Sequence, residues 1–294
     1  MSKVVSRLLT FFIGIPLVIA IVCVHAYNHL ALHIFVCAIA FCAAHEMYNL
    51  FANRMELLPR PFVVACTVFL PLSTAFADVF PAFAGRPPVF ACNTAYLALV
   101  VAFVAVLFAE VVSARDFSGS LHRMSGSLFI VMYAGFLISF VPRMTVFFKN
   151  GTSVSVPCIA TFLLLVFFCD SIAWLFGVLF GKNNRGLVKA SPNKSIAGFA
   201  GGFAGSVSVG LVCRAVWPHV FSGSASKLVA LAVLVALAAE TGDLAESIFK
   251  RSSQLKDSGS IIPGRGGILD SIDSILLAAP LYYIMVQILY GPLS

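Results

Sequence analysis

The sequence predicts an all-α polytopic membrane protein with about nine transmembrane helices, and three observations support this prediction. Of the 294 residues, 60% are hydrophobic and only 11% are charged, whereas a globular domain has roughly 25% charged residues. The mean hydropathy is +1.00. Apolar runs of about 20 residues recur along the chain, and each is long enough to cross the hydrocarbon core as a helix. Because the runs are continuously apolar rather than alternating, helices are favoured over a β-barrel.

The nine predicted spans follow one another with short polar connections. Lys3 and Arg7 precede the first span, but its apolar stretch continues without a small-residue cleavage site, which favours a membrane helix over a signal peptide. Pro71 and Pro81 predict a kink or a break in the third span. The spans are Leu8–His25, Leu30–Leu50, Phe62–Phe83, Val89–Val112, Ser127–Phe147, Pro157–Phe180, Ile196–Trp217, Leu228–Glu246 and Ile268–Tyr290.

Basic residues are distributed unevenly between the two sides that nine spans create. Fourteen of the 19 lysines and arginines fall on the side of the N-terminus. The positive-inside rule therefore predicts a cytoplasmic N-terminus and an outside C-terminus. The basic side would face anionic lipid headgroups of the bilayer and anionic metabolites. No nucleic-acid-binding module is visible, so no nucleic-acid partner is expected, and the eight scattered cysteines predict neither a disulfide framework nor a zinc site.

Residues 243–273 are polar although apolar segments flank them on both sides. Charge beside the hydrocarbon usually marks a site of chemistry or transport. Asp270 and Asp273 lie three residues apart near the expected start of the last helix, on one face and at its positive end. Together with Asp243 they provide the oxygen ligands that Mg²⁺ prefers. The alternative is that one aspartate caps the helix and both are solvated.

Asp243, Glu246, Ser247 and Lys250 fall on one stripe of the eighth predicted helix, at offsets of three, four and seven. A stripe this polar must face other helices or a cavity. It holds either an internal Asp–Lys ion pair or a lysine that binds a substrate phosphate. Residues 263–267, with the sequence PGRGG, would let backbone N–H groups approach a ligand closely, as phosphate-binding nests do.

A second polar cluster lies at the sixth and seventh spans. Asp170, inside the sixth span, either lines a cavity or makes a helix–helix hydrogen bond. Ser191, Lys194 and Ser195 precede the seventh span and predict a helix start with Ser195 as its cap. Four glycines between positions 198 and 205 form one small face, which favours tight helix packing over ligand contact.

Two features of the N-terminal spans indicate a functional site less clearly. His25, His29 and His33 follow one helical spacing, but no carboxylate is near them in sequence, so interfacial anchoring is expected. Glu46 inside the second span needs a partner or a water-filled cavity, and structural and functional roles stay equally open for it.

These residues resemble the signature of the phosphatidate cytidylyltransferases, also called CDP-diacylglycerol synthases. That signature begins Ser-x-x-Lys-Arg, continues after four residues with Lys-Asp-x-Gly, and ends Pro-Gly-His-Gly-Gly-x-x-Asp-Arg-x-Asp. The upstream order of an intramembrane Asp, Gly-Lys, Ser-Pro-x-Lys-Ser and a Gly-Gly pair is also similar, so the resemblance is specific over roughly 170–274. The signature residues present here are Ser247, Lys250, Arg251, Lys256, Asp257, Gly259, Pro263, Gly264, Gly266, Gly267, Asp270 and Asp273.

The chain departs from the family pattern at three positions. Arg265 replaces the family's His, and Ser271 replaces its Arg. These two changes are expected to compensate, because one guanidinium is lost and another is gained six residues away. Ala197 stands where a Glu usually precedes Gly198, and this missing carboxylate has no evident substitute in the sequence.

The resemblance implies a metal-dependent enzyme of phospholipid synthesis that converts CTP and phosphatidate to CDP-diacylglycerol and pyrophosphate. It implies Mg²⁺ at Asp243, Asp270 and Asp273, with a second metal ion left open. It also implies a multi-pass protein of the cell (inner) membrane whose active site faces the cytoplasm, and a homodimer whose interface the sequence does not reveal. The implied catalytic residues are Asp243, Lys250, Lys256, Asp257, Asp270 and Asp273. The implied substrate contacts are Asp170, Ser191, Lys194, Ser195, Ser247, Arg251, Gly264, Arg265, Gly266 and Gly267.

The implied organisation is a group of N-terminal transmembrane helices at 1–113, a middle segment at 114–156 and a catalytic region with a cytoplasmic-side polar cavity at 157–294. Two rivals share parts of this pattern. A lipid kinase or a cytidylyltransferase for an isoprenoid lipid would have the same topology. A secondary transporter could use Glu46, Asp170 and Asp243 as an ion path, but no internal repeat is visible and the polar residues crowd the last third, which favours the enzyme.

Overall fold

The computed structural model describes residues 14, 16–83, 92–186, 188–262, 266–291 and 293. Within them, eight helices are long and apolar enough to cross a membrane, which confirms the all-α polytopic class. Of the first predicted span, Leu8–His25, residues 8–13 and 15 lie outside the described residues, and residues 16–23 are helical. Two antiparallel strands of two residues each, β1 (Phe148–Lys149) and β2 (Thr152–Ser153), form the only sheet in the described part of the chain.

The chain divides into two units, which are described separately. Unit 1 comprises Met1–Val146 and Phe249–Ile272, and unit 2 comprises Phe147–Ile248 and Asp273–Ser294. The boundaries fall inside α9 (Ala225–Ser252) and α10 (Leu269–Tyr290), so each of these helices contributes residues to both units. The regions predicted from the sequence divide the chain by function, and that division stays a prediction.

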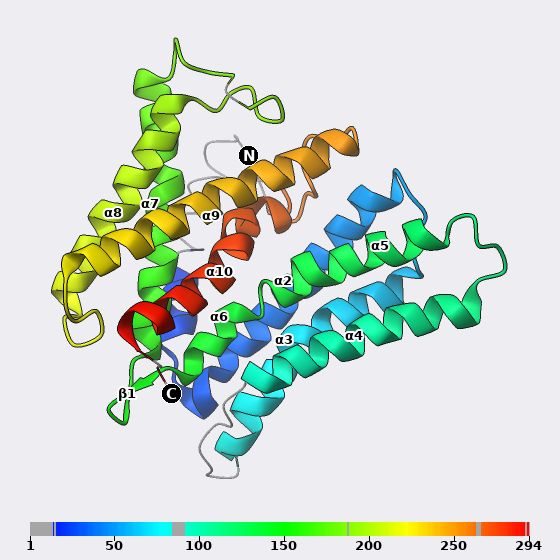
Figure 1. The fold of residues 1–294 in the computed structure, drawn as a ribbon, viewed down its shortest axis with the longest axis horizontal. Coiled ribbons are helices and arrows are strands. Elements are labelled where there is room, and N and C mark those ends of the chain that lie inside the picture. The colour runs from blue at the N-terminus through cyan, green and yellow to red at the C-terminus, as the bar shows by residue number, and fades with distance from the viewer. Residues whose placement is uncertain are drawn as a thin grey trace. The chain divides into compact units, whose positions relative to one another are not determined.

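Unit 1 is a group of packed helices in which α3 contacts α2, α4 and the π-helical turn η1 (Figure 1). Several of its fully buried residues are small, among them Ala40, Ala43 and Ala44 of α2. Small side chains let helix backbones approach closely, which favours van der Waals packing inside a membrane. The elements are α2 (Ala26–Ala52), α3 (Arg60–Phe83), α4 (Cys92–Ser113), α5 (Ser120–Ile130), η1 (Val131–Phe136), α6 (Phe140–Arg143) and η2 (Met144–Val146).

The interrupted span of unit 1 is the fifth predicted one rather than the third. α3 continues as one helix through Pro71 and Pro81, so the predicted break is absent there. The segment from Ser120 to Val146 instead passes through η1, α6 and η2. At Gly135, inside η1, an added Cβ would lie 2.5 Å from the carbonyl oxygen of Thr67 on α3. The close approach of η1 to α3 therefore requires glycine, and the π-helical turn accommodates the local change in winding.

The histidines near the start of α2 correct another expectation. His29 and His33 are only 2% and 1% exposed, so interfacial anchoring is wrong for both. The Nε2 atom of His33 lies 3.9 Å from the carboxylate of Asp78 on α3 and 3.4 Å from the hydroxyl of Thr145. No local pattern pointed to this partner, because Asp78 belongs to a different span.

Unit 2 contains α7 (Ser155–Phe180) and α8 (Ile196–Val216), which pack side by side (Figure 1). The predicted glycine face makes this contact possible. A Cβ at Gly201 would lie 2.6 Å from the Phe176 side chain, and one at Gly205 would lie 2.8 Å from Ile172. The prediction of tight helix packing at these glycines is confirmed.

Two hydrogen bonds attach the remaining helices of unit 2 to this pair. The Ser206 hydroxyl on α8 donates to the carbonyl of Ala232 on α9 over 3.1 Å. The buried Tyr282 hydroxyl on α10 donates to the carbonyl of Cys158 on α7 over 2.8 Å. Because water is absent from the hydrocarbon, such polar groups must find partners inside the protein.

The predicted start of α10 agrees with the structure, whereas the predicted end of α9 does not. α10 begins at Leu269, within one residue of the predicted start. α9 continues to Ser252, about a turn and a half beyond the predicted end at Glu246. The apolar pattern marks only the part of a helix that lies in hydrocarbon and so ends at Glu246, whereas the polar stripe correctly placed Ser247 and Lys250 on the same helix.

Candidate active site

In unit 1, the carboxylate of Glu46 anchors the loop between α9 and α10. Glu46 lies on α2 and is 4% exposed. It accepts hydrogen bonds from the backbone N–H groups of Ile268 and Leu269, at 2.9 and 2.8 Å, and from the Ser258 hydroxyl at 3.1 Å. The first N–H groups of a helix have no partner within the helix. Glu46 therefore supplies acceptors at the start of α10, and these donors are the partners that its buried position required.

Asp270, in the first turn of α10, closes the same loop from its other side. Its Oδ1 accepts from the Lys250 ammonium at 2.7 Å. Its Oδ2 accepts from the Ser258 backbone N–H at 3.0 Å, from the Ser258 hydroxyl at 2.8 Å and from the Gly267 N–H at 2.7 Å. Asp270 thus joins the loop to the first turn of α10. Its side chain is 8% exposed and Asp273 is 8% exposed, so the alternative in which both aspartates are solvated is wrong, while the role of Asp270 as a metal ligand stays a prediction.

The glycines of this loop give space to the two carboxylates. A Cβ added at Gly259 or Gly267 would collide with the carboxyl group of Glu46, and one at Gly266 would lie 2.6 Å from Asp270 Oδ2. Gly266 also has a φ of +117°, which favours glycine. The N–H of Gly266 donates to Ile262 and that of Gly267 to Asp270. Their predicted contact with a substrate phosphate would require these bonds to be exchanged.

In unit 2, Lys194 forms the centre of a carboxylate-rich cluster. Its ammonium lies 2.7 Å from Glu240 Oε2 and 2.9 Å from Asp243 Oδ2. Burial by itself would lower the pKa of Lys194, but the charges of Asp243 and Glu240 outweigh it and raise that pKa above its ordinary value. Lys194 is therefore a permanent cation at neutral pH.

The loop between α7 and α8 holds Lys194 in place. Arg185 and Ser195 form an isolated antiparallel bridge, and the N–H of Gly186 donates to the carbonyl of Lys194 at 3.2 Å. The Ser195 side chain accepts from the N–H of Gly198 at 3.0 Å, so the predicted cap of α8 is confirmed. Lys194 therefore extends from a fixed turn rather than from a free loop.

Three more acidic groups of unit 2, Asp170, Glu246 and Asp273, interact with Asp243 or with one another. Asp170 accepts from the Ser274 hydroxyl at 3.2 Å. Asp273 is 8% exposed and lies near enough to Asp170, Asp243 and Glu246 to be repelled by their charges. The helices cross closely here, because a Cβ at Gly242 of α9 would collide with the carbonyl oxygen of Asp273. The cluster thus holds more carboxyl groups than Lys194 alone can pair with.

The donor chemistry of this cluster fits a hard divalent cation, which prefers carboxylate oxygens. Within the described ranges, however, no three His, Cys, Asp or Glu side chains already share one coordination point. The ligand set predicted from the sequence therefore remains a prediction, although two of its members, Asp243 and Asp273, belong to this cluster.

The remaining predicted site residues divide between the units. Arg251, Lys256 and Asp257 are exposed in unit 1, and Ser247 is 9% exposed in unit 2. Ser191 belongs to the turn before Lys194, whose N–H donates to the Ser191 carbonyl at 3.1 Å. The predicted contacts Gly264 and Arg265 lie outside the described residues.

Sequence reasoning overlooked Glu240 and Ser258. Glu240 lies three residues before Asp243, on the same face of α9, and an acidic residue near the end of an apolar span was the available signal. Ala197 lacks the carboxylate expected from the resemblance, and Glu240 places one 2.7 Å from Lys194 from a different helix. Ser258 gave no signal, because its two acceptors, Glu46 and Asp270, are far from it in sequence.

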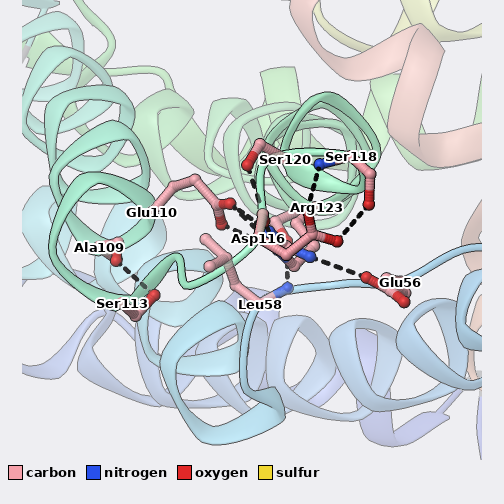
Figure 2. A network of polar contacts seen from close by, with 10 residues as sticks. Glu56, Leu58, Ala109, Glu110, Ser113, Asp116, Ser118, Ser120 and Arg123 are labelled. Carbon is pink, nitrogen blue, oxygen red and sulfur yellow. Dashed lines mark hydrogen bonds and ion pairs between the residues drawn. The ribbon is translucent and has the colours of Figure 1, made fainter.

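A further polar network in unit 1 surrounds Arg123 (Figure 2). The Arg123 guanidinium contacts Glu110 at 2.6 Å, Glu56 at 2.8 Å and the carbonyl of Asp116 at 2.8 Å. A pocket lined by residues 52–57 and Arg123 lies beside it. Since two carboxylates already neutralise Arg123, the network ties the α2–α3 and α4–α5 loops together rather than offering a site for a phosphate.

Comparison with known proteins identifies the family. Residues 5–289 match the model described as the cytidylyltransferase family. A phosphatidate cytidylyltransferase from Staphylococcus aureus (strain COL) is 36% identical over 166 residues, which are 55% of this chain and 63% of that protein. One from Staphylococcus saprophyticus is 40% identical over 123 residues, or 42% of this chain and 46% of that protein. The matched region thus spans less than two thirds of these relatives.

Proposed function

The chain belongs to the cytidylyltransferase family, and we propose that it transfers the cytidylyl group of CTP to phosphatidate. The products would be CDP-diacylglycerol and pyrophosphate. The observation that carries the proposal is the gathering of Asp170 and Asp273 beside Asp243, which pairs with a fixed Lys194, in a membrane protein of this family. The names of the staphylococcal relatives support phosphatidate as the acceptor.

The reaction needs no nucleophile from the protein. An oxygen of the phosphatidate phosphate attacks the α-phosphorus of CTP, a new P–O bond forms, and the bond from that phosphorus to the bridging oxygen of pyrophosphate breaks. The attacking phosphate is already ionised at neutral pH, so a general base is not required. The difficulty is that two anions must meet and an anionic group must leave, which calls for fixed positive charge.

Asp243 and Asp273 would hold Mg²⁺, which when bound neutralises charge on the phosphates of CTP and on the pyrophosphate leaving group. The surplus of carboxylates over Lys194 supports this assignment. Asp270 is the third ligand predicted from the sequence, and its hydrogen bonds to Lys250 and Ser258 would have to be exchanged for it to serve.

Basic side chains near the predicted ligands would bind the phosphates. Lys194 extends into the carboxylate cluster of unit 2, while Arg251 and Lys256 are exposed on unit 1. Lys250 is held by Asp270 and would exchange this partner for a phosphate oxygen. In this proposal the aspartates bind the cation and the basic residues bind the anions.

The orientation proposed from the basic residues completes the proposal. With nine spans, the loops that carry Lys194 and Lys256 face the cytoplasm, where CTP is available, and the C-terminus lies outside. The bacterial relatives support a place in the cell membrane. The homodimer implied by the family resemblance stays a prediction.

The direct test is incorporation of labelled CTP into lipid by purified protein in detergent with phosphatidate, with and without Mg²⁺. We expect metal-dependent formation of CDP-diacylglycerol. A parallel reaction with an isoprenoid phosphate in place of phosphatidate tests the acceptor. If folded protein forms no product with phosphatidate but does so with the isoprenoid phosphate, the proposed acceptor is wrong.

A further inference from the structure

Two carboxylates of α9 share Lys194, and they differ in their surroundings. Glu240 and Asp243 lie one helical turn apart and contact the ammonium at 2.7 and 2.9 Å. The Glu240 side chain is only 7% exposed, whereas that of Asp243 is 38% exposed. The second oxygen of Glu240 faces α8, where a Cβ at Gly202 would lie 2.9 Å from it. Glu240 is therefore fixed between two helices, and Asp243 is accessible.

Asp243 cannot form its ion pair with Lys194 and ligate a divalent cation equally well at the same time. An ammonium 2.9 Å from its carboxylate occupies a lone pair and repels a second cation at the same group. When Asp243 turns to a cation, Lys194 needs another partner, because an ammonium that is mostly buried is costly without one. Glu240 is the carboxylate in contact with Lys194 that does not belong to the predicted ligand set.

We infer that Glu240 is a positioning residue: it holds Lys194 ready for a substrate phosphate and keeps it from occupying Asp243. This inference rests on the proposed function. Without the Glu240 charge, the ammonium would pair with Asp243 alone. Both the phosphate that Lys194 should bind and the cation that Asp243 should bind would then be held more weakly.

The test is the variant Glu240→Gln, which keeps the size of the side chain and removes its charge. We expect KM for CTP or for phosphatidate to rise about tenfold, the loss expected for one charge-assisted contact, while kcat changes less than threefold. Which KM rises identifies the phosphate that Lys194 binds. Equilibrium binding of labelled CTP without phosphatidate gives a readout that is independent of turnover.

A second readout measures Mg²⁺ binding in the absence of both substrates. Mg²⁺ raises the melting temperature of a protein that binds it in the folded state. In Glu240→Gln we expect the Mg²⁺ concentration for half of this shift to increase several-fold. The matched control is Glu110→Gln, which removes a similarly buried carboxylate from its pair with Arg123 in unit 1 and should change neither KM nor the Mg²⁺ response.

A double-mutant cycle separates this mechanism from general damage. If Glu240 acts through Lys194, then Glu240→Gln adds nothing further to KM in a Lys194→Met background. Additive effects, a loss confined to kcat, or the same change in Glu110→Gln would overturn the inference. If Glu240→Gln does not fold, an unchanged KM for both substrates in Lys194→Met overturns it instead. Absence of product from the unaltered protein would count against the proposed function, and not specifically against Glu240.

Discussion

The two acidic clusters of this protein contain the same types of side chain but surround them with different partners. In unit 1, Glu46 and Asp270 accept hydrogen bonds from backbone N–H groups, from Ser258 and from Lys250. In unit 2, Asp170, Asp243 and Asp273 repel one another around Lys194. Unit 1 thus balances its carboxylates with donors, whereas the cluster of unit 2 gathers more carboxyl groups than Lys194 pairs with.

The comparison teaches that a buried carboxylate must be judged by its partners and not by its burial. A carboxylate surrounded by donors stabilises the fold, because each hydrogen bond to a charged group contributes about 1.5–3 kcal/mol. Carboxylates that face one another destabilise the fold and persist where they serve a function. Removing one negative charge should therefore have opposite effects on stability in the two clusters.

The largest expected effect comes from Asp273→Asn in unit 2. Losing a cation ligand removes several kcal/mol of stabilisation of the developing charge, so turnover should fall roughly a thousandfold. The melting temperature should stay the same or rise, because the repulsion from Asp170 and Asp243 is relieved. Incorporation of labelled CTP and thermal unfolding measure the two effects. Full activity with unchanged metal dependence would refute the ligand assignment.

Glu46→Gln tests the other side of the comparison. A glutamine cannot accept from Ile268, Leu269 and Ser258 together, and its amide group would face donors. We expect the free energy of unfolding to fall by about 2 kcal/mol and activity to fall about tenfold as the loop loses its position. The control is Glu56→Gln, whose side chain is 71% exposed and should cost about 0.5 kcal/mol or less. Equal losses in the two variants would contradict the anchoring role.

Gly259→Ala probes the space around Glu46 without removing its charge. The new Cβ would collide with the Glu46 carboxyl group, so we expect a loss of about 1–3 kcal/mol. Gly210→Ala on α8 is the matched control, since its Cβ would meet the flexible end of Leu165 at 3.3 Å and alanine favours helices. Thermal unfolding of both variants measures these losses. Equal melting temperatures for the two variants would mean that the loop adjusts freely to the new Cβ.

The smallest effect concerns the basic residue of the PGRGG turn. Arg265→His should lower activity a few-fold, and adding Ser271→Arg should restore it if the guanidinium has moved between the two positions. Ser271 now donates its hydroxyl to the Gly267 carbonyl at 3.4 Å, a weak bond whose loss is inexpensive. Independent, additive changes in kcat/KM would exclude compensation.

Much of the site was accessible from the sequence because its spacing is local. Offsets of three and four place Asp243, Glu246 and Ser247 on one face of a helix whatever surrounds it. The structure buries Glu246 and Ser247, as the polar stripe predicted. The cap at Ser195 and the start of α10 were likewise predicted from nearby residues. The buried role of His33 could not be, because its partner Asp78 is on another helix.

The sequence by itself determined the membrane spans, the helical class and the segments that carry the polar residues, since hydropathy and helical spacing are properties of about 20 consecutive residues. Only the tertiary structure decided which charge meets which partner. Glu46 reaches Ile268 across 222 residues, and Lys194 reaches Glu240 across 46. Such pairs depend on how helices pack, and packing depends on close contacts between surfaces that no local pattern encodes.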